Sequence, residues 1–512
     1  MGSNKFKGPF IKNISNTNNN NNNYNNNYNN TKPTDMNYSR HLIYLPVSVL
    51  VATAACSWRM PEQPSGMQMQ VPERFAQPRA NEGSTNAPTV GARWWQRLED
   101  PVLDDLQNQL ALESPNLIAL AAVVDQAKAA VGLAQSSLWP TLNANTSVVR
   151  SQSYLTAPSG TYISESFPFT WTPDIWGALD AQVISAKAQQ RGSEENLAMA
   201  RLTAQATLMQ TYLTMRNVER EQEALLSAER SYAKALEITQ HRYNSGVAAS
   251  TDVALAKLQL SNTKAQRIDL GVQRAQLQHA IAALIGKNPV PFFLEPTAKI
   301  AAPVSLPELL PGELIKRRPD IRAATRAVEA AQGSLGAAKM AFFPTVTFSS
   351  SLGYRSTQLP GLIGSRNAYW SLGPTLSLPL LDGGQRQANK TSAEASLDQV
   401  VATYRQVVIA AFQEVEDNLV ATALLQEEGI VLLEALDAAK KNLAATQQQY
   451  LAGTVGYLNV TSAQTSELQA ERALMDMENR RWLAITQLLK NLAGEWDLAQ
   501  IQPKALKSSA NQ

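Results

Sequence analysis

The sequence predicts a mixed α and β membrane protein whose structural unit occurs twice along the chain. Two prolines of the second half, Pro319 and Pro344, follow Pro115 and Pro140 at the same distance of 204 residues. Each half also contains two stretches of alternating apolar and polar residues and one very long proline-free stretch. Alternation indicates strands, and a long stretch without proline permits a long helix. We therefore expect two internal repeats, each of two strands and long helices.

The segments outside the repeats differ from them in composition. Asparagine dominates residues 1–35, and because so few apolar groups cannot offset the entropy of ordering, we predict a disordered leader. Residues 36–55 place Arg40 before an apolar run, which is typical of a secretory signal peptide. Residues 56–92, rich in Pro, Gln and Gly, predict an extended linker. We assign the first repeat to 93–300, the second to 301–496 and a C-terminal tail to 497–512.

Cys56 is the single cysteine of the chain and follows small residues at the end of the signal. This position predicts cleavage before Cys56 and acylation of its thiol, for example with palmitate, so that the linker is lipid-anchored. Thr53 departs from the usual signal, which has leucine three residues before the cysteine. The alternative is an ordinary signal peptide followed by an incidental buried thiol.

The alternating stretches place apolar side chains on one face and small polar side chains on the other. In the second half Val346, Phe348 and Leu352 alternate with threonines and serines, and residues 370–378 repeat the pattern. The first half follows it less regularly over 142–148 and 163–171. Two interpretations are open: a soluble sheet on a core, or a membrane barrel with lipid outside and a wet lumen. Four strands cannot enclose an aqueous lumen, so a barrel requires an oligomer.

The proline-free stretches, 177–243 and 384–450, predict helical rods of about 100 Å. Their apolar positions step by three and four residues, which is coiled-coil spacing. The sequences RYNSG and QYLAG place Gly246 and Gly453 where each rod reverses, and returning helices are expected over 251–285 and 458–492. Rods this long expose apolar seams, so they need partners.

Charge and motif content lower the expectation of several other functions. The net charge is +2, from 45 Lys and Arg against 43 Asp and Glu, and no basic cluster indicates binding to nucleic acid. Three scattered histidines and one cysteine do not predict a metal site. Motifs of familiar enzymes and cofactor sites are absent from the sequence. We expect no catalysis and no cofactor.

Four sequence features together resemble the TolC/OprM family of outer-membrane efflux proteins, in its lipoprotein (NodT-like) branch. They are RWWQRLEDPVLDDL at 93–106, RRPDIRAA at 317–324, PDIWG at 173–177 against LLDGG at 380–384, and the two glycine turns. The resemblance implies a homotrimer with one twelve-stranded outer-membrane barrel, continued by a helical coiled-coil barrel into the periplasm. It also implies a periplasmic membrane-fusion adaptor and an inner-membrane pump, of the RND type, as partners.

The resemblance further implies a constriction at the periplasmic end, beside the helix turns. Carried over by motif, the aperture residues are Thr251, Asp252, Tyr450, Asn459 and Ser462. Some relatives have acidic residues where this chain has Asn459 and Ser462, so a strongly acidic second-repeat gate is not expected. Ser250, Thr251, Asp252 and Asn459 could instead cap the returning helices, while Asp252 also suits a helix N-terminus.

The predicted function is a passive exit duct for small toxic compounds such as drugs, with consequences for antibiotic resistance. One alternative is the outer-membrane duct of a type I protein secretion system. Another is a periplasmic coiled-coil scaffold or adaptor lipoprotein, which would explain the rods but not the strand faces. The pair Trp94-Trp95 is expected to pack in a belt around the rods rather than to bind a ligand.

Overall fold

A computed structural model describes residues 64–67, 93–152, 159–297 and 317–492. The predicted leader, signal peptide and C-terminal tail, together with Cys56, lie outside these residues. Within the predicted linker, Ser65–Met67 forms a single 3-10 turn (η2). Met67 is buried against Tyr404 and Val408, so this part of the linker contacts a long helix.

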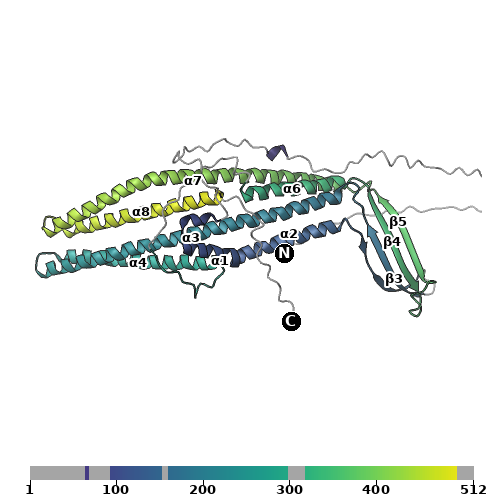
Figure 1. The fold of residues 1–512 in the computed structure, drawn as a ribbon, viewed down its shortest axis with the longest axis horizontal. Coiled ribbons are helices and arrows are strands. Elements are labelled where there is room, and N and C mark those ends of the chain that lie inside the picture. Colours follow the sequence, from purple (N-terminus) through teal and green to yellow (C-terminus); the bar gives the residue numbers. More distant parts are fainter. Residues whose placement is uncertain (1–63, 68–92, 153–158, 298–316, 493–512) are drawn as a thin grey trace, which may run out of the picture. The chain divides into compact units, whose positions relative to one another are not determined.

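The helices follow the order expected for two repeats (Figure 1). Both long rods have 67 residues, as α3 (Ala178–Asn244) and α7 (Gln385–Leu451). The returning helices are α4 (Ser250–Leu284) and α8 (Tyr457–Leu492). The shorter elements are η3 (Trp94–Leu98), α1 (Pro101–Glu113), α2 (Pro115–Ser136) and α6 (Pro319–Met340). Pro115 and Pro319 begin α2 and α6, where a proline costs no helical hydrogen bond.

The strands form one antiparallel sheet in the order β1/β2, β3, β4, β5. Their bounds are β1 (Thr141–Leu142), β2 (Asn145–Ser151), β3 (Gly160–Trp171), β4 (Thr345–Ser356) and β5 (Ala368–Ser377). The first predicted strand is divided in two, yet β1 and β2 keep one register against β3. Asn143 donates its N–H to the Pro168 carbonyl, but Pro168 has no N–H to return, which accounts for the interruption.

The strand registers gather the predicted apolar residues on a single face of the sheet. Phe167 pairs with Leu352, Leu352 pairs with Trp370, and Val346 pairs with Leu376. Serine and threonine pairs lie on the opposite face, as in the hydroxyl contact of Ser147 with Ser164 at 2.8 Å. Trp370 is 77% exposed, so this apolar face has no core beneath it within the described chain.

The helices are arranged in the same sequence as the strands to which they connect. Next to the sheet the contacts run α2–α3–α6–α7, and toward the turns they run α4–α3–α8–α7. At the junction, Trp171 and Trp176 donate indole N–H groups to the carbonyls of Leu138 and Pro344. One side of the described chain therefore ends in β1/β2, α2 and α4, and the other side ends in β5 and α7.

The largest apolar core surrounds the middle of α3. Trp94 and Trp95 are buried there against α1, α3 and the end of α8, with their rings edge to face at 6.1 Å. The expectation that this pair packs against the helices agrees with that burial. Tyr212 of α3 donates to Asp100 Oδ2 at 2.6 Å, and Asp100 in turn caps α1.

Candidate functional site

The two reversals between helices are built alike. Gly246 and Gly453 have φ of 77° and 78°, a left-handed conformation that glycine adopts without the Cβ penalty. Beyond each helix end, Val247 N donates to the Arg242 carbonyl, and Thr454 N donates to the Gln449 carbonyl. This six-residue bond is the Schellman arrangement that ends many helices. The structure thus places Gly246 and Gly453 at the tips as expected.

An aromatic cluster joins the two tips. Tyr450, at the end of α7, is 7% exposed and meets Tyr457 edge to face at 5.3 Å. Arg242, at the end of α3, lies 4.8 Å from the centre of the Tyr450 ring and donates to the Leu451 carbonyl at 3.3 Å. Burial and the neighbouring Tyr450 raise the pKa of Tyr457 to about 12, so its hydroxyl stays protonated at neutral pH.

The other predicted aperture residues lie around this cluster with different exposure. Thr251, Asn459 and Ser462 are exposed, and Asp252 is half-buried in the first turn of α4. The alternative that Ser250, Thr251 or Asp252 caps α4 is wrong, because Ala249 is the N-cap and no side chain bonds there. Asn459 is the third residue of α8 rather than a residue before it. Whether these residues line an aperture stays a prediction.

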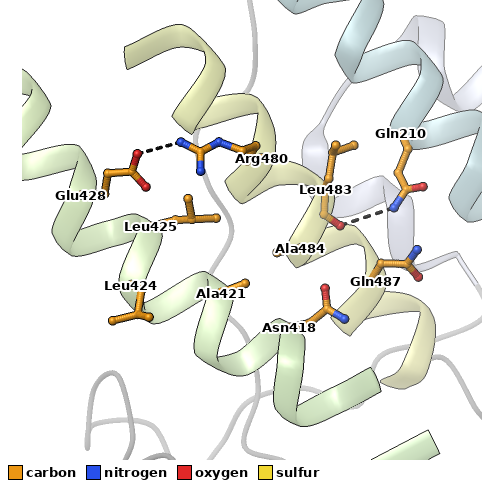
Figure 2. A pocket seen from close by; sticks show the side chains of 10 residues that line it. All are labelled: Gln210, Asn418, Ala421, Leu424, Leu425, Glu428, Arg480, Leu483, Ala484 and Gln487. Atoms are coloured by element: carbon orange, nitrogen blue, oxygen red, sulfur yellow. Dashed lines mark hydrogen bonds and ion pairs between the residues drawn. The ribbon is translucent and has the colours of Figure 1, made fainter. Parts of the chain in front are cut away.

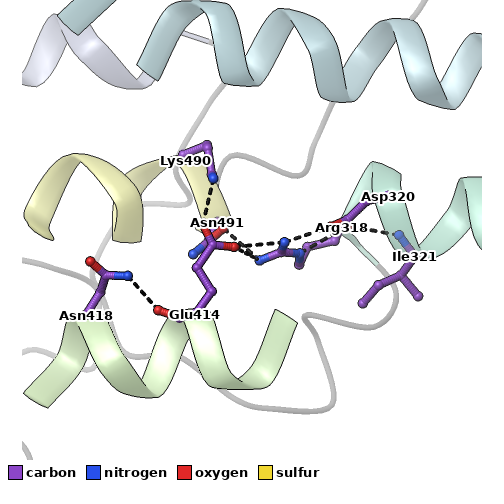
Figure 3. Close-up of polar contacts among 7 residues, drawn as sticks. All are labelled: Arg318, Asp320, Ile321, Glu414, Asn418, Lys490 and Asn491. Atoms are coloured by element: carbon purple, nitrogen blue, oxygen red, sulfur yellow. Dashed lines mark hydrogen bonds and ion pairs between the residues drawn. The ribbon is translucent and has the colours of Figure 1, made fainter. Parts of the chain in front are cut away.

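Sequence reasoning missed a buried polar network at the start of α6 (Figure 3). Arg318 is bidentate with Asp320, at 3.1 and 2.7 Å, and reaches Glu414 of α7 and Asn491 of α8. Lys490 donates to the second oxygen of Glu414 at 2.7 Å. Burial opposes the charge of Arg318, but Asp320 and Glu414 outweigh it and raise its pKa. The motif RRPDIRAA contains Arg318 and Asp320, yet nothing in it points to partners far along the chain.

A second polar network holds the chain after α4 against the first repeat. Arg216 and Glu219, both with 3% exposed side chains, pair at 2.7 Å, and Arg274 binds the other oxygen of Glu219. The two arginines also donate to the backbone carbonyls of Glu295 and Leu294. In the second repeat the counterpart of the Arg274–Glu219 ion pair is a hydrogen bond from Arg481 to the uncharged Gln426 at 3.1 Å.

A groove of about 590 Å³ lies between α7 and α8, with Gln210 of α3 at one side (Figure 2). Leucines and alanines supply five of the ten residues that line it, and the ion pair of Arg480 with Glu428 lies at one end. Gln210 donates to the Leu483 carbonyl. The lining offers no nucleophile–base pair. Among the described residues, no group of three His, Cys, Asp or Glu side chains could hold a metal ion.

An open sheet with a bare apolar face, continued by very long paired helices, defines a subunit of a membrane channel rather than a soluble scaffold. The family model described as "Outer membrane efflux protein" matches residues 106–287 and 310–494. The chain belongs to this family, and the predicted resemblance is confirmed. It is a bacterial outer membrane efflux protein.

Individual relatives and a solved structure support the assignment of the chain to this family. The chain is 31% identical over 331 residues to outer membrane protein OprJ of Pseudomonas aeruginosa, covering 63% of this chain and 68% of OprJ. It is 26% identical to the toluene efflux pump outer membrane protein TtgF of Pseudomonas putida, covering 90% and 98%. The solved structure of the outer-membrane channel OprN is similar with a TM-score of 0.78 at 25% identity, covering 86% of this chain and 98% of that chain.

Proposed function

We propose that three copies of this chain form a passive exit duct for small toxic compounds in the outer membrane. The main observation in support is that the sheet and the helical layer end on the same two sides of the chain. Neither β1/β2 nor β5 has a second neighbour in the described chain, and α2, α4 and α7 lie at the matching helical edges. Unpaired strand edges are not tolerated in lipid, so copies of the chain must pair β5 with β1/β2 of the next.

The dimensions of the strands support insertion into a bilayer. Strands β3 and β4 have 12 residues each and β5 has 10, close to the 9–11 that a tilted strand needs to cross. The exposed apolar face would meet lipid, and the serines and threonines would line the lumen. Four strands from each of three copies give a barrel wide enough for an aqueous path.

The helical edges support the same assembly. The stretch Pro101–Ser136 has a mean hydropathy of 1.7 in its most apolar window, and only 17% of that window is buried. Because α2 packs along α3, its exposed side chains Ile118, Val123 and Leu133 suit contact with a neighbouring copy rather than a membrane crossing. Three pairs of hairpins would then enclose a periplasmic tunnel.

The tips of the tunnel are the proposed aperture and docking end. Thr251, Asp252, Asn459 and Ser462 would surround the opening, with Tyr450 holding the hairpins together from the buried side. TtgF is named as the outer membrane protein of a toluene efflux pump, which supports a pump as a partner. We infer that this pump is an inner-membrane one of the RND type and that a periplasmic adaptor joins it to the duct. The duct itself has no proposed catalytic role. Acylated Cys56 would add a lipid anchor.

Deleting the gene is expected to raise sensitivity to dyes, solvents and antibiotics, and a plasmid copy should restore tolerance. Unchanged tolerance together with loss of a secreted protein would instead support a protein-secretion duct. Extraction of washed membranes addresses the scaffold alternative. A Cys56→Ser chain should still require detergent if its strands are inserted in lipid, whereas release by buffer alone would contradict a barrel.

A further inference from the structure

The strands of the sheet carry few charged side chains, and their register assigns each one to a face. Strands β1 to β5 contain three charged residues, Arg150, Glu165 and Arg355. Arg150 lies two residues from Val148, and Glu165 lies two residues from Phe167, so both share the apolar face. Arg355 is the one charged residue of these strands that falls on the polar face.

Arg355 has no compensating charge on its own face. It pairs with Ser164, whose hydroxyl belongs to the polar face, and its side chain is exposed. The sequence 357–367, which joins β4 to β5, contains Arg366 and no acidic residue, and the sequence 152–159, which joins β2 to β3, contains no charged residue. Because β4 follows α6 and β5 leads to α7, these connections lie at the end of the sheet away from the helices. That end of the polar face is therefore positive.

An aromatic side chain holds Arg355 in place. Gly353 of β4 is buried and pairs directly with Tyr369 of β5. A Cβ at Gly353 would clash with the backbone carbonyl of Glu165 and stand 2.9 Å from Tyr369 Cζ, so glycine lets the tyrosine lie over β4. The Arg355 guanidinium carbon is 5.6 Å from the centre of that aromatic ring, within the range of a cation–π contact. The Arg355 side chain thus has a defined position on the polar face.

We propose that Arg355 is a specificity-determining residue, and that its three copies form a positive ring at the outer mouth of the duct that favours organic anions. The proposal rests on the trimeric duct and names a class of compound that it passes. In that duct the polar face lines the lumen, so each protomer contributes one Arg355 to the ring. Guanidinium groups bind carboxylates, sulfonates and phosphates through paired N–H donors. Compounds that carry these groups are therefore the favoured class.

The width of the barrel decides how far this charge reaches. Twelve strands about 4.8 Å apart and tilted by about 40° close a barrel roughly 24 Å across between backbones. Every point of the lumen at the level of the arginine ring then lies within about 12 Å of a guanidinium group, whereas the Debye length is about 30 Å in 0.01 M salt and about 3 Å in 1 M salt. Coulomb's law in water gives roughly a threefold enrichment of a monovalent anion in the dilute salt, and almost none in the concentrated salt.

Thiol labelling inside the lumen measures this enrichment without depending on the helix tips. Ser371 is exposed on the polar face of β5, and Ser371→Cys in a Cys56→Ser chain provides a single thiol about 14 Å from the nearest Arg355. The protein, purified in non-ionic detergent, is treated with a sulfonate-bearing and with a trimethylammonium-bearing methanethiosulfonate. In 0.01 M salt, Arg355→Gln should lower the ratio of anionic to cationic labelling rates about threefold, and in 1 M salt it should leave that ratio unchanged.

Two further variants control for the charge and for its position. Arg150→Gln removes the same charge from the apolar face of the same sheet and should change the ratio little, and Arg355→Lys keeps the charge and should keep the ratio. A ratio that is insensitive to Arg355→Gln, or that falls equally in Arg150→Gln, would overturn the arginine ring while leaving the duct intact. If neither reagent labels Ser371→Cys in the folded protein, the polar face does not line a wet lumen, and the duct itself is contradicted.

Discussion

Arg318 holds Glu414 through both terminal guanidinium nitrogens, each 3.0 Å from Oε2, and so joins the start of α6 to the middle of α7. The side chain of Arg318 is 6% exposed. The counterparts in the first repeat, Ser114 and Thr207, carry no charge. This fixed point is therefore particular to the second repeat, where the end of α8 also reaches Glu414 through Lys490.

Replacing Arg318 is expected to destabilise the second repeat. Arg318→Ala leaves Asp320 and Glu414 without their shared cation, and because both carboxylates are about a quarter exposed, we expect a loss of about 2 kcal/mol rather than the full cost of a buried charge. Thermal unfolding in detergent measures it. Arg326→Ala, which removes a more exposed pair on the same helix, should cost about 0.5 kcal/mol. Equal losses of stability in the two variants would show that the network contributes no more than an exposed ion pair.

The link between the tips should control how readily they separate. Arg242→Gln removes the cation that lies over the Tyr450 ring, a contact worth about 1 kcal/mol. Because the variant channel should open more readily, we expect higher conductance in planar bilayers. Cells that carry it should be more sensitive to large antibiotics. Tyr450→Phe is the matched control, because the Tyr450 hydroxyl is buried without a hydrogen-bond partner. That variant should conduct like the parent; if it opens the channel as Arg242→Gln does, the link has been misassigned.

The turn glycines should not tolerate a side chain. Gly453→Ala forces alanine into the left-handed region and should cost about 1 kcal/mol, although open space surrounds the position. Gly456→Ala, in the same turn and equally open, has no positive φ and should cost little. Hydrogen exchange of the backbone amides at the tip measures the difference in local stability between the two variants. Similar protection in both variants would argue against strain at Gly453.

A barrel also predicts opposite outcomes for neighbouring residues of β5. Leu372 is 70% exposed on the apolar face, and Ser371 lies on the polar face. Leu372→Lys should cost about 2–4 kcal/mol of insertion and reduce the amount of protein in the outer membrane. Ser371→Lys should insert normally and change ion selectivity. If both substitutions are tolerated alike, the apolar face does not contact lipid.

Much of the fold could be predicted because the signals are local. Absence of proline and a period near 3.5 defined α3 and α7, and alternation defined which face of each strand is apolar. The interruption between β1 and β2 depends on Pro168 in the opposite strand, so the first strand alone could not show it.

The site was predicted less completely, because its interactions connect distant residues. Sequence motifs located Gly246 and Gly453, but Arg242 meets Tyr450 only once two hairpins are side by side. Arg318 likewise finds Glu414 and Asn491 at separations of 96 and 173 residues. Capping at Thr251 and Asp252 was a reasonable local expectation, yet the helix begins one residue earlier, after Ala249.

The mass of the detergent-solubilised complex tests the trimeric duct most directly. Light scattering corrected for bound detergent should give three times the mass of the mature chain. A monomeric mass, with four strands unable to enclose a pore, would contradict the duct.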